Sequence, residues 1–238
     1  MTKKIKKVTT VVTTTTEEII NTNEKTHIIC VLDRSGSMSS IMADSIGGFN
    51  TFLKTQKELP DEATITIALF DDKHEMLYDN VDIKKAEELT NKVWYPRGCT
   101  ALYDAIGKTI NAEKANFAKL GNEKPSKVLV VVVTDGAENA SKEYNLDAIK
   151  KLIAECEKDD WNFMYLAANQ DAFSVSQSFG ISYGNTLNYT ASADGVGVMS
   201  TRMSNATTRY RGMSKMDASY TADSKLLINN DDDNIDKD

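Results

Sequence analysis

Two apolar runs of this 238-residue chain end in an acidic residue, and two serines follow one of them. In "VLDRSGSM" the apolar run is followed by Asp33, and Ser35 and Ser37 come after it at alternate positions. In "VVVVTDG" the apolar run leads to Asp135. Alternate side chains of an extended backbone point to the same side, so the two serine hydroxyls should lie together. A turn, a nucleophile and a metal site are the three interpretations of this pattern.

A third hydroxyl comes from Thr100, in the loop "YPRGCT" before a predicted helix. Two carboxylates and three hydroxyls form an all-oxygen set, which suits Mg²⁺, a cation that takes about six oxygen ligands and usually keeps several waters. Softer metals prefer His or Cys, and Cys99 is the only residue of either type in these loops. The residue types therefore predict a hard divalent cation, Mg²⁺, with Mn²⁺ or Ca²⁺ as alternatives.

The segments around these residues alternate between strand and helix patterns. Short apolar or alternating runs predict strands, and apolar residues at helical spacing predict helices. We expect strands at 26–33, 64–70, 75–79, 127–135, 161–168 and 186–190, and helices at 42–53, 82–89, 102–120, 146–156, 172–180 and 196–210. The expected helix caps are Ser39 and Ser40 for the first helix, Asp82 for the second and Asn145 for the fourth.

This alternation predicts an α/β fold: a doubly wound three-layer sandwich with a six-stranded, mostly parallel sheet and one antiparallel edge strand. Ligands of such sheets bind outside the carboxyl ends of the strands, where the strand order reverses. If the strands that precede Asp33 and Asp135 are central neighbours, both carboxylates face the same crevice.

The two ends of the chain differ in composition from the middle. Residues 1–25 combine four lysines with the β-branched run "VTTVVTTTT" and are predicted to be an N-terminal arm. Residues 214–238 end in an acidic run and are predicted to be a disordered tail. The sequence thus predicts one domain, at 26–213.

Composition excludes several classes of protein. The net charge of −7 argues against a nucleic-acid binder, which needs clustered Lys and Arg for phosphate contacts. No apolar stretch is long enough for a membrane span, and no apolar region follows the N-terminal lysines as a secretory signal requires. Cys30, Cys99 and Cys156 have no paired spacing, which favours free thiols in a reducing compartment. We therefore expect a cytoplasmic protein.

Three of these segments together resemble a known family. "DRSGSM", the Thr of "GCTALYDAI" and the Asp of "VVVTDG" occur in the order of the metal-ion-dependent adhesion site of von Willebrand factor type A domains. The resemblance covers nearly all of residues 26–213, and it is to the stand-alone bacterial or phage members. It implies metal coordination by the hydroxyls of Ser35, Ser37 and Thr100, with Asp33 and Asp135 binding directly or through water.

The resemblance also implies a function. Neutral hydroxyl ligands leave a cation much of its charge and an open position, which an Asp or Glu of a protein partner can fill. Around the site we expect a partner-binding rim formed by Arg34, Cys99 and Glu138. Cys99 stands where the family usually has glycine, and Arg34 could instead pair with a nearby acid.

An enzyme and a structural component are the alternatives to a recognition module. An enzyme is not favoured, because no P-loop motif follows a strand and no His or Lys is predicted near the metal. A structural role in a complex or virion would have the domain and the N-terminal arm bridge subunits, and removing residues 1–25 would then abolish assembly. Elsewhere, we expect Asp71 and Asp72 to be turn residues, Asp104 to stabilise a helix N-terminus, and His27 and His74 to have no metal role.

Overall fold

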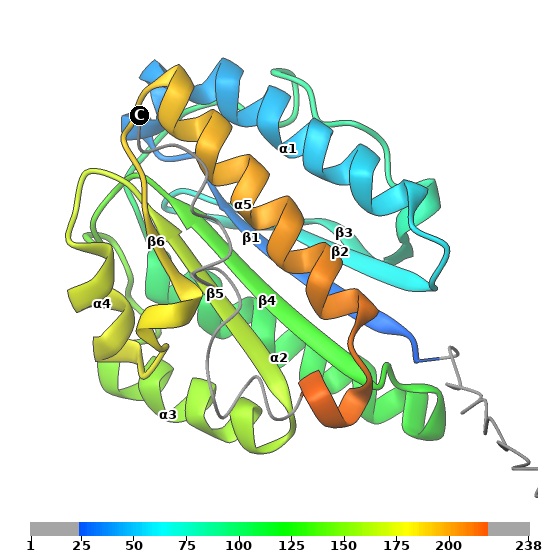
Figure 1. Cartoon of the computed structure of the whole chain (residues 1–238). Helices are drawn as coiled ribbons and strands as arrows, with labels where there is room; N and C mark the ends of the chain where they lie inside the picture. Colours follow the sequence, from blue (N-terminus) through cyan, green and yellow to red (C-terminus); the bar gives the residue numbers. More distant parts are fainter. Residues whose placement is uncertain (1–23, 219–238) are drawn as a thin grey trace, which may run out of the picture.

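The structure, a computed structural model, describes residues 24–218 around one six-stranded sheet (Figure 1). The strand order is β3-β2-β1-β4-β5-β6, and all neighbours run parallel except β2 and β3. The strands are β1 Thr26–Asp33, β2 Ala63–Phe70, β3 His74–Asp82, β4 Lys127–Thr134, β5 Trp161–Ala167 and β6 Thr186–Asn188. The predicted mostly parallel sheet with one antiparallel edge strand is confirmed.

Five α-helices cover the two faces of the sheet within the described residues (Figure 1). One face packs against α1 and α5, and the other against α2, α3 and α4. The helices are α1 Met42–Glu58, α2 Leu102–Leu120, α3 Leu146–Lys158, α4 Ala172–Phe179 and α5 Ala193–Gly212. The three-layer sandwich is confirmed, and no helix of the described region is long and apolar enough to span a membrane.

The two central strands, β1 and β4, are buried on both faces. Along β1, Ile28 and Leu32 pack beneath α1 and α5, whereas Ile29 and Val31 face the opposite helical layer. A strand covered on both faces needs apolar side chains at every position, which explains the continuous apolar runs of the sequence. The parallel pairing of β1 with β4 brings their carboxyl ends side by side.

The helix predicted at 82–89 is wrong beyond its first turn. Asp82 caps a 3-10 turn, Ile83–Lys85, by accepting a hydrogen bond from the N–H of Lys84. The chain then becomes irregular because the side-chain amide of Asn50 bonds both backbone groups of Leu89, at 2.9 and 2.8 Å. This tertiary contact replaces the hydrogen bonds that a helix would supply.

The caps were predicted with mixed success. Ser39 and Ser40 do not cap α1: they lie in a 3-10 turn, Gly36–Ser40, and the Ser39 hydroxyl donates to the carbonyl of Gly36. Asn145 does cap α3, accepting from the N–H of Ala148.

The structure describes residues on both sides of the predicted domain, 26–213, and the predicted division into arm, domain and tail stays a prediction. The carbonyl of Lys25 accepts hydrogen bonds from Ser126 and Lys127, and Ala218, predicted to lie in the tail, is buried in the core beneath α5. Most of the predicted arm and tail, residues 1–23 and 219–238, lies outside the described residues.

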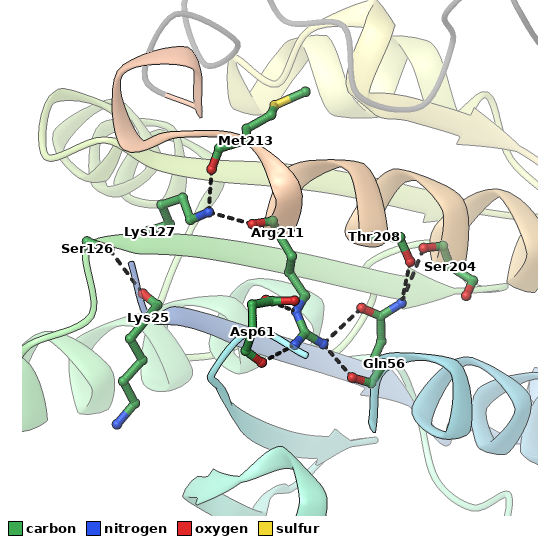
Figure 2. Close-up of polar contacts among 9 residues, drawn as sticks. All are labelled: Lys25, Gln56, Asp61, Ser126, Lys127, Ser204, Thr208, Arg211 and Met213. Carbon is green, nitrogen blue, oxygen red and sulfur yellow. Dashed lines mark hydrogen bonds and ion pairs between the residues drawn. The ribbon is translucent and has the colours of Figure 1, made fainter. Parts of the chain in front are cut away.

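Buried charged side chains fasten the C-terminal end of α5 (Figure 2). The Arg211 guanidinium donates to the Asp61 carboxylate at 2.7 Å and to the carbonyls of Asp61 and Gln56 at 2.8 and 2.6 Å. The buried Lys127 ammonium, at the start of β4, donates to the carbonyls of Arg211 and Met213 at 2.7 and 2.6 Å. Burial lowers the pKa of Lys127. These contacts tie the last helix to α1 and to the sheet.

We predict that Arg211→Ala lowers the free energy of unfolding by about 3 kcal/mol, because it leaves the buried carbonyls and Asp61 without their donor. Arg202→Ala, on the same helix but with a more exposed side chain, is the matched control. Urea unfolding followed by circular dichroism measures both. Equal stability of the two variants would contradict an anchoring role for Arg211.

Candidate metal centre

The predicted acidic residues lie at the point where the strand order of the sheet reverses. From the central pair the chain proceeds to β2 and β3 on one side and to β5 and β6 on the other. Asp33 is the last residue of β1, and Asp135 directly follows its neighbour β4. The expectation that these strands are adjacent is confirmed, and both acids stand at the edge where doubly wound sheets bind ligands.

Three hydroxyls from two loops surround a single point beside these acids. Ser35 Oγ and Ser37 Oγ are 3.0 Å apart, and the Ser37 hydroxyl donates to Asp135 Oδ1 at 2.6 Å. A Cβ placed on Gly136 would lie 2.9 Å from Thr100 Oγ1, 3.1 Å from Ser37 Oγ and 3.6 Å from Ser35 Oγ. The structure therefore brings together all five residues predicted to hold the metal.

The two carboxylates are buried but differ in their partners. Asp33 accepts the N–H of Ser35 on one oxygen and the Thr134 hydroxyl on the other, both at 2.6 Å. Burial raises the pKa of Asp33 to about 6 despite these hydrogen bonds. Asp135 Oδ2 is buried without a hydrogen-bond partner in the described structure, and burial raises the pKa of this carboxyl too.

This set of donors fits a hard cation. A buried carboxylate oxygen without a donor is costly, and a cation next to it would remove that cost. Within residues 24–218, no three or more His, Cys, Asp or Glu side chains lie together so that they could hold a metal. The further oxygen donors beside the two carboxylates are therefore hydroxyls. A metal at this position would thus depend on Ser35, Ser37 and Thr100 for much of its coordination.

The Thr100 loop is fixed from two sides. Asn139 accepts the N–H of Thr100 on its side-chain oxygen and returns a backbone hydrogen bond to the Thr100 carbonyl, at 2.9 and 3.0 Å. On the other side, the N–H of Gly36 donates to the carbonyl of Gly98 at 3.1 Å. Gly98 has a φ of 65°, which a non-glycine residue adopts only with strain. Backbone contacts thus hold the third hydroxyl beside the two serines.

Asp71, predicted to be a plain turn residue, is instead a fully buried connection between these loops. Its carboxylate pairs with Arg34 at 3.1 Å and with Arg97, and accepts the N–H of Lys73. Its carbonyl accepts the N–H of Ala101 at 2.9 Å. One residue thus joins the serine loop, the threonine loop and the β2–β3 turn. Acidity within a turn was the only sequence signal, and it did not distinguish this role.

The three predicted rim residues differ in their exposure and in their contacts. Arg34 is 1% exposed and forms ion pairs with Asp71 and Glu75, so its predicted place on a partner-binding rim is wrong. The alternative, pairing with a nearby acid, is what the structure has. Cys99 is exposed beside Thr100, and its contact with a partner stays a prediction.

Glu138 is half-buried, and its carboxylate is engaged within the chain. It accepts the N–H groups of Tyr103, Ala140 and Ser141, each within 2.9 Å. Asp104 likewise reaches beyond its own helix, accepting the N–H groups of Lys142, Glu143 and Tyr144. Both acids therefore hold the segment after β4 against the start of α2, and a partner contact for Glu138 stays a prediction.

Neither histidine contacts the candidate metal site. His27 lies at the opposite end of β1, where it bonds Thr64 and pairs with Glu113 at 3.4 Å. His74 starts the edge strand β3 and bonds Thr109 of α2.

The fold and the order of the site residues define a von Willebrand factor type A fold. No family model and no curated protein matches the chain, so this conclusion comes from solved structures of low identity. The vWF domain of the type V pili tip protein Mfa5 from Porphyromonas gingivalis has a TM-score of 0.59 at 8% identity, over 81% of this chain and 98% of that one.

Two further neighbours carry a metal. Proximal thread matrix protein 1 from the mussel byssus, solved with a zinc-occupied MIDAS motif, has a TM-score of 0.54 at 16% identity, over 84% of this chain and 47% of its own length. Manganese-loaded TRAP protein from Plasmodium vivax has a TM-score of 0.55 at 16% identity, over 71% and 70% of the two chains. This chain thus spans about half of the mussel protein.

We predict that Gly136→Ala lowers the affinity for Mg²⁺ about tenfold or more, because the added methyl would occupy the space between the three hydroxyls. Gly47→Ala, where a Cβ meets no atom within 4 Å, is the matched control and should bind as the wild type does. Titration calorimetry gives both affinities. Unchanged binding by Gly136→Ala would place the metal elsewhere.

We expect Asp71 to contribute to the stability of the fold in a pH-dependent way. Burial alone raises its pKa, but hydrogen bonds from Arg97 and Lys73, with the charges of Arg34 and Arg97, hold the pKa below its usual value. A carboxyl whose pKa is lowered by folding stabilises the native state above its unfolded pKa, and this contribution disappears as the pH falls through the folded pKa.

Asp71→Asn should therefore lower the free energy of unfolding by about 2 kcal/mol at neutral pH, with a gap to wild type that narrows on acidification to about pH 3. Urea unfolding at several pH values, with chelator present, measures the gap. Asp72→Asn, at the exposed neighbouring acid, is the control. A gap for Asp71→Asn that does not change with pH would refute the charged role of Asp71.

Proposed function

We propose that this protein is a metal-dependent recognition domain that binds a protein partner through a divalent cation, Mg²⁺. Ser35, Ser37 and Thr100 would hold the cation by their hydroxyls, with Asp33 and Asp135 binding directly or through water. The observation that carries the proposal is the convergence of three hydroxyls around Gly136, next to the unpartnered buried oxygen of Asp135. The zinc and manganese bound by two neighbours of the same fold support a divalent cation.

The hydrogen bonds of the site explain how it would act on a partner. Asp33 shares its charge with the Ser35 N–H and the Thr134 hydroxyl, which leaves Asp135 as the acid with a free oxygen. A cation held largely by neutral hydroxyls retains positive charge toward the solvent, where Ser37 is exposed. A carboxylate of the partner, from Asp or Glu, would then complete the coordination.

Recognition fits this site better than catalysis. A metal-dependent enzyme needs a general base or nucleophile within hydrogen-bond reach of the reacting atom. Both histidines are bonded elsewhere, and the hydroxyls of Ser35 and Ser37 bond each other and Asp135. The neighbours named as a pilus tip protein and a byssus matrix protein support an interaction module.

We extend the proposal to a cytoplasmic location and to partners that are neither nucleic acid nor membrane. Cys30 and Cys156 are buried as free thiols and Cys99 is exposed and free, which supports a reducing compartment. The net charge of −7 supports a protein partner over a polyanion.

Titration of Mg²⁺ and Mn²⁺ into the wild type and into the double variant Ser35→Ala, Ser37→Ala tests the metal site. We expect saturable binding by the wild type and none by the variant, because two of three hydroxyl ligands are lost. Ser178→Ala, which removes a hydroxyl of α4 that bonds only its own helix, is the control and should bind normally. A folded wild type that binds neither metal would refute the site.

Recognition is tested separately with immobilised peptides that present Asp or Glu, paired with otherwise identical peptides that present Asn or Gln. Binding should require the acidic residue and should disappear with chelator and in the double variant. Metal binding without any preference for acidic peptides would leave the metal site intact and overturn the proposed mode of recognition.

A further inference from the structure

A cavity of about 350 Å³ opens at the edge of the sheet opposite the metal centre, at the amino ends of β4 and β5. Phe117 of α2, Val128 of β4 and Trp161 of β5 form its apolar wall, with the two rings edge to face at 5.4 Å. Its volume lies in the range of roughly 300 to 1,000 Å³ usual for ligand sites in proteins.

The polar groups around this cavity carry more positive than negative charge. Its lining includes the lysines Lys114, Lys124 and Lys215 and two aspartates, Asp159 and Asp160. Lys114 also approaches a glutamate of α3 at 3.7 Å, whereas Lys124 stands exposed on the loop before β4. The proposed function uses none of these residues. An occupant with an apolar part and a negatively charged part would match the wall and the lysines together.

The last described residues of the chain lie at the same end of the sheet as this cavity. Ala218, the last described residue, is buried, and its carbonyl accepts a hydrogen bond from the side chain of Asn162, the neighbour of Trp161. Lys215, three residues earlier, lines the cavity. The twenty residues that follow, 219–238, therefore begin at the same end of the sheet as the cavity, three residues past a residue that lines it, although Ala218 itself packs on the other face of the sheet.

The composition of this segment has the required chemistry. Its sequence "SYTADSKLLINNDDDNIDKD" places the apolar group "LLI", residues 226–228, before the acidic group "DDD", residues 231–233. The segment as a whole contains six aspartates and two lysines. An extended chain spans about 3.3 to 3.6 Å per residue, so the residues between Ala218 and Leu226 can cover up to about 30 Å.

We propose that residues 219–238 dock into this cavity of their own chain, with residues 226–228 against Phe117 and Trp161 and residues 231–233 beside Lys114 and Lys124. The apolar contact removes the exposed aliphatic side chains from water, and the lysines select the acidic run that follows. The site is independent of the metal centre, because the two lie at opposite edges of the sheet.

Zero-length cross-linking of the full chain tests the proposal directly. A carbodiimide adds to a carboxyl group to form an O-acylisourea. A lysine amine within contact distance then attacks its carbonyl carbon, which forms the amide and releases the carbodiimide as a urea. In dilute protein we expect amides between residues 231–233 and Lys114 or Lys124, located by mass spectrometry. The Lys114–Glu155 pair, at 3.7 Å, should also cross-link and shows that the chemistry works.

Mixing isotopically light and heavy chains separates links within one chain from links between two. Links from residues 231–233 only to Lys3, Lys4, Lys6 or Lys7 would overturn the proposal in favour of contact between the two ends of the chain. Links found only between light and heavy chains would assign the cavity to a second copy. Absence of these links while Lys114–Glu155 forms would also overturn it.

Variants of the full chain test specificity. Lys124→Glu should lower the yield of the link from residues 231–233 to Lys114 about fivefold, as expected for reversal of an exposed ion pair. Leu227→Asp should lower it as well, because the apolar contact is lost. Lys119→Glu, an exposed residue of α2 outside the cavity lining, makes the same change of charge and should leave the yield unchanged. An equal effect of Lys119→Glu would reveal general attraction in place of docking.

Discussion

The parallel pairing of β1 with β4 is the constraint on which the rest of the candidate site depends. It places the two strands side by side, and each of them leads into an acidic residue. Within the described residues, this pair is the only place in the sheet where the strand order reverses. The Thr134 hydroxyl bonds Asp33 across this pair at 2.6 Å, so the end of one strand fixes the acid of the other. The charge of Asp135 adds to the burial that raises the pKa of Asp33, because each of two neighbouring carboxylates disfavours ionisation of the other.

Around this pair, charged side chains hold the loops in place, whereas the proposed metal ligands include neutral hydroxyl groups. Arg34 and Arg97 flank the buried Asp71 and fasten the loops that carry the serines and the threonine. The proposed ligands are hydroxyls: Ser35 Oγ and Ser37 Oγ lie 3.0 Å apart, and Asn139 fixes the backbone N–H of Thr100 at 2.9 Å. The charges of the arginines are balanced by Asp71 and Glu75, so they support the loops without opposing a cation nearby.

Much of the fold, and the residues that meet at the candidate site, could be predicted from the sequence because both depend on local pattern. The apolar runs before Asp33 and Asp135 and the spacing of Ser35 and Ser37 are local features, and the mostly parallel sheet follows from the alternation of strands and helices. What failed depends on contacts between distant residues. Asp71 sits in a turn like any other aspartate until two arginines reach it, and the helix expected after Asp82 is interrupted by Asn50, more than thirty positions earlier.

The anchoring contacts at the far edge of the sheet have a consequence for how the domain can be joined to other chains. Lys25 bonds Ser126, and the adjacent Lys127 bonds the end of α5, so the segment that leads into β1 and the segment that follows α5 lie at neighbouring points (Figure 2). Asp33 and Asp135 lie at the other ends of the same strands. A domain of this geometry can be inserted into a loop of a host protein, or carried on a stalk, with the end of the sheet that carries Asp33 and Asp135 directed outward.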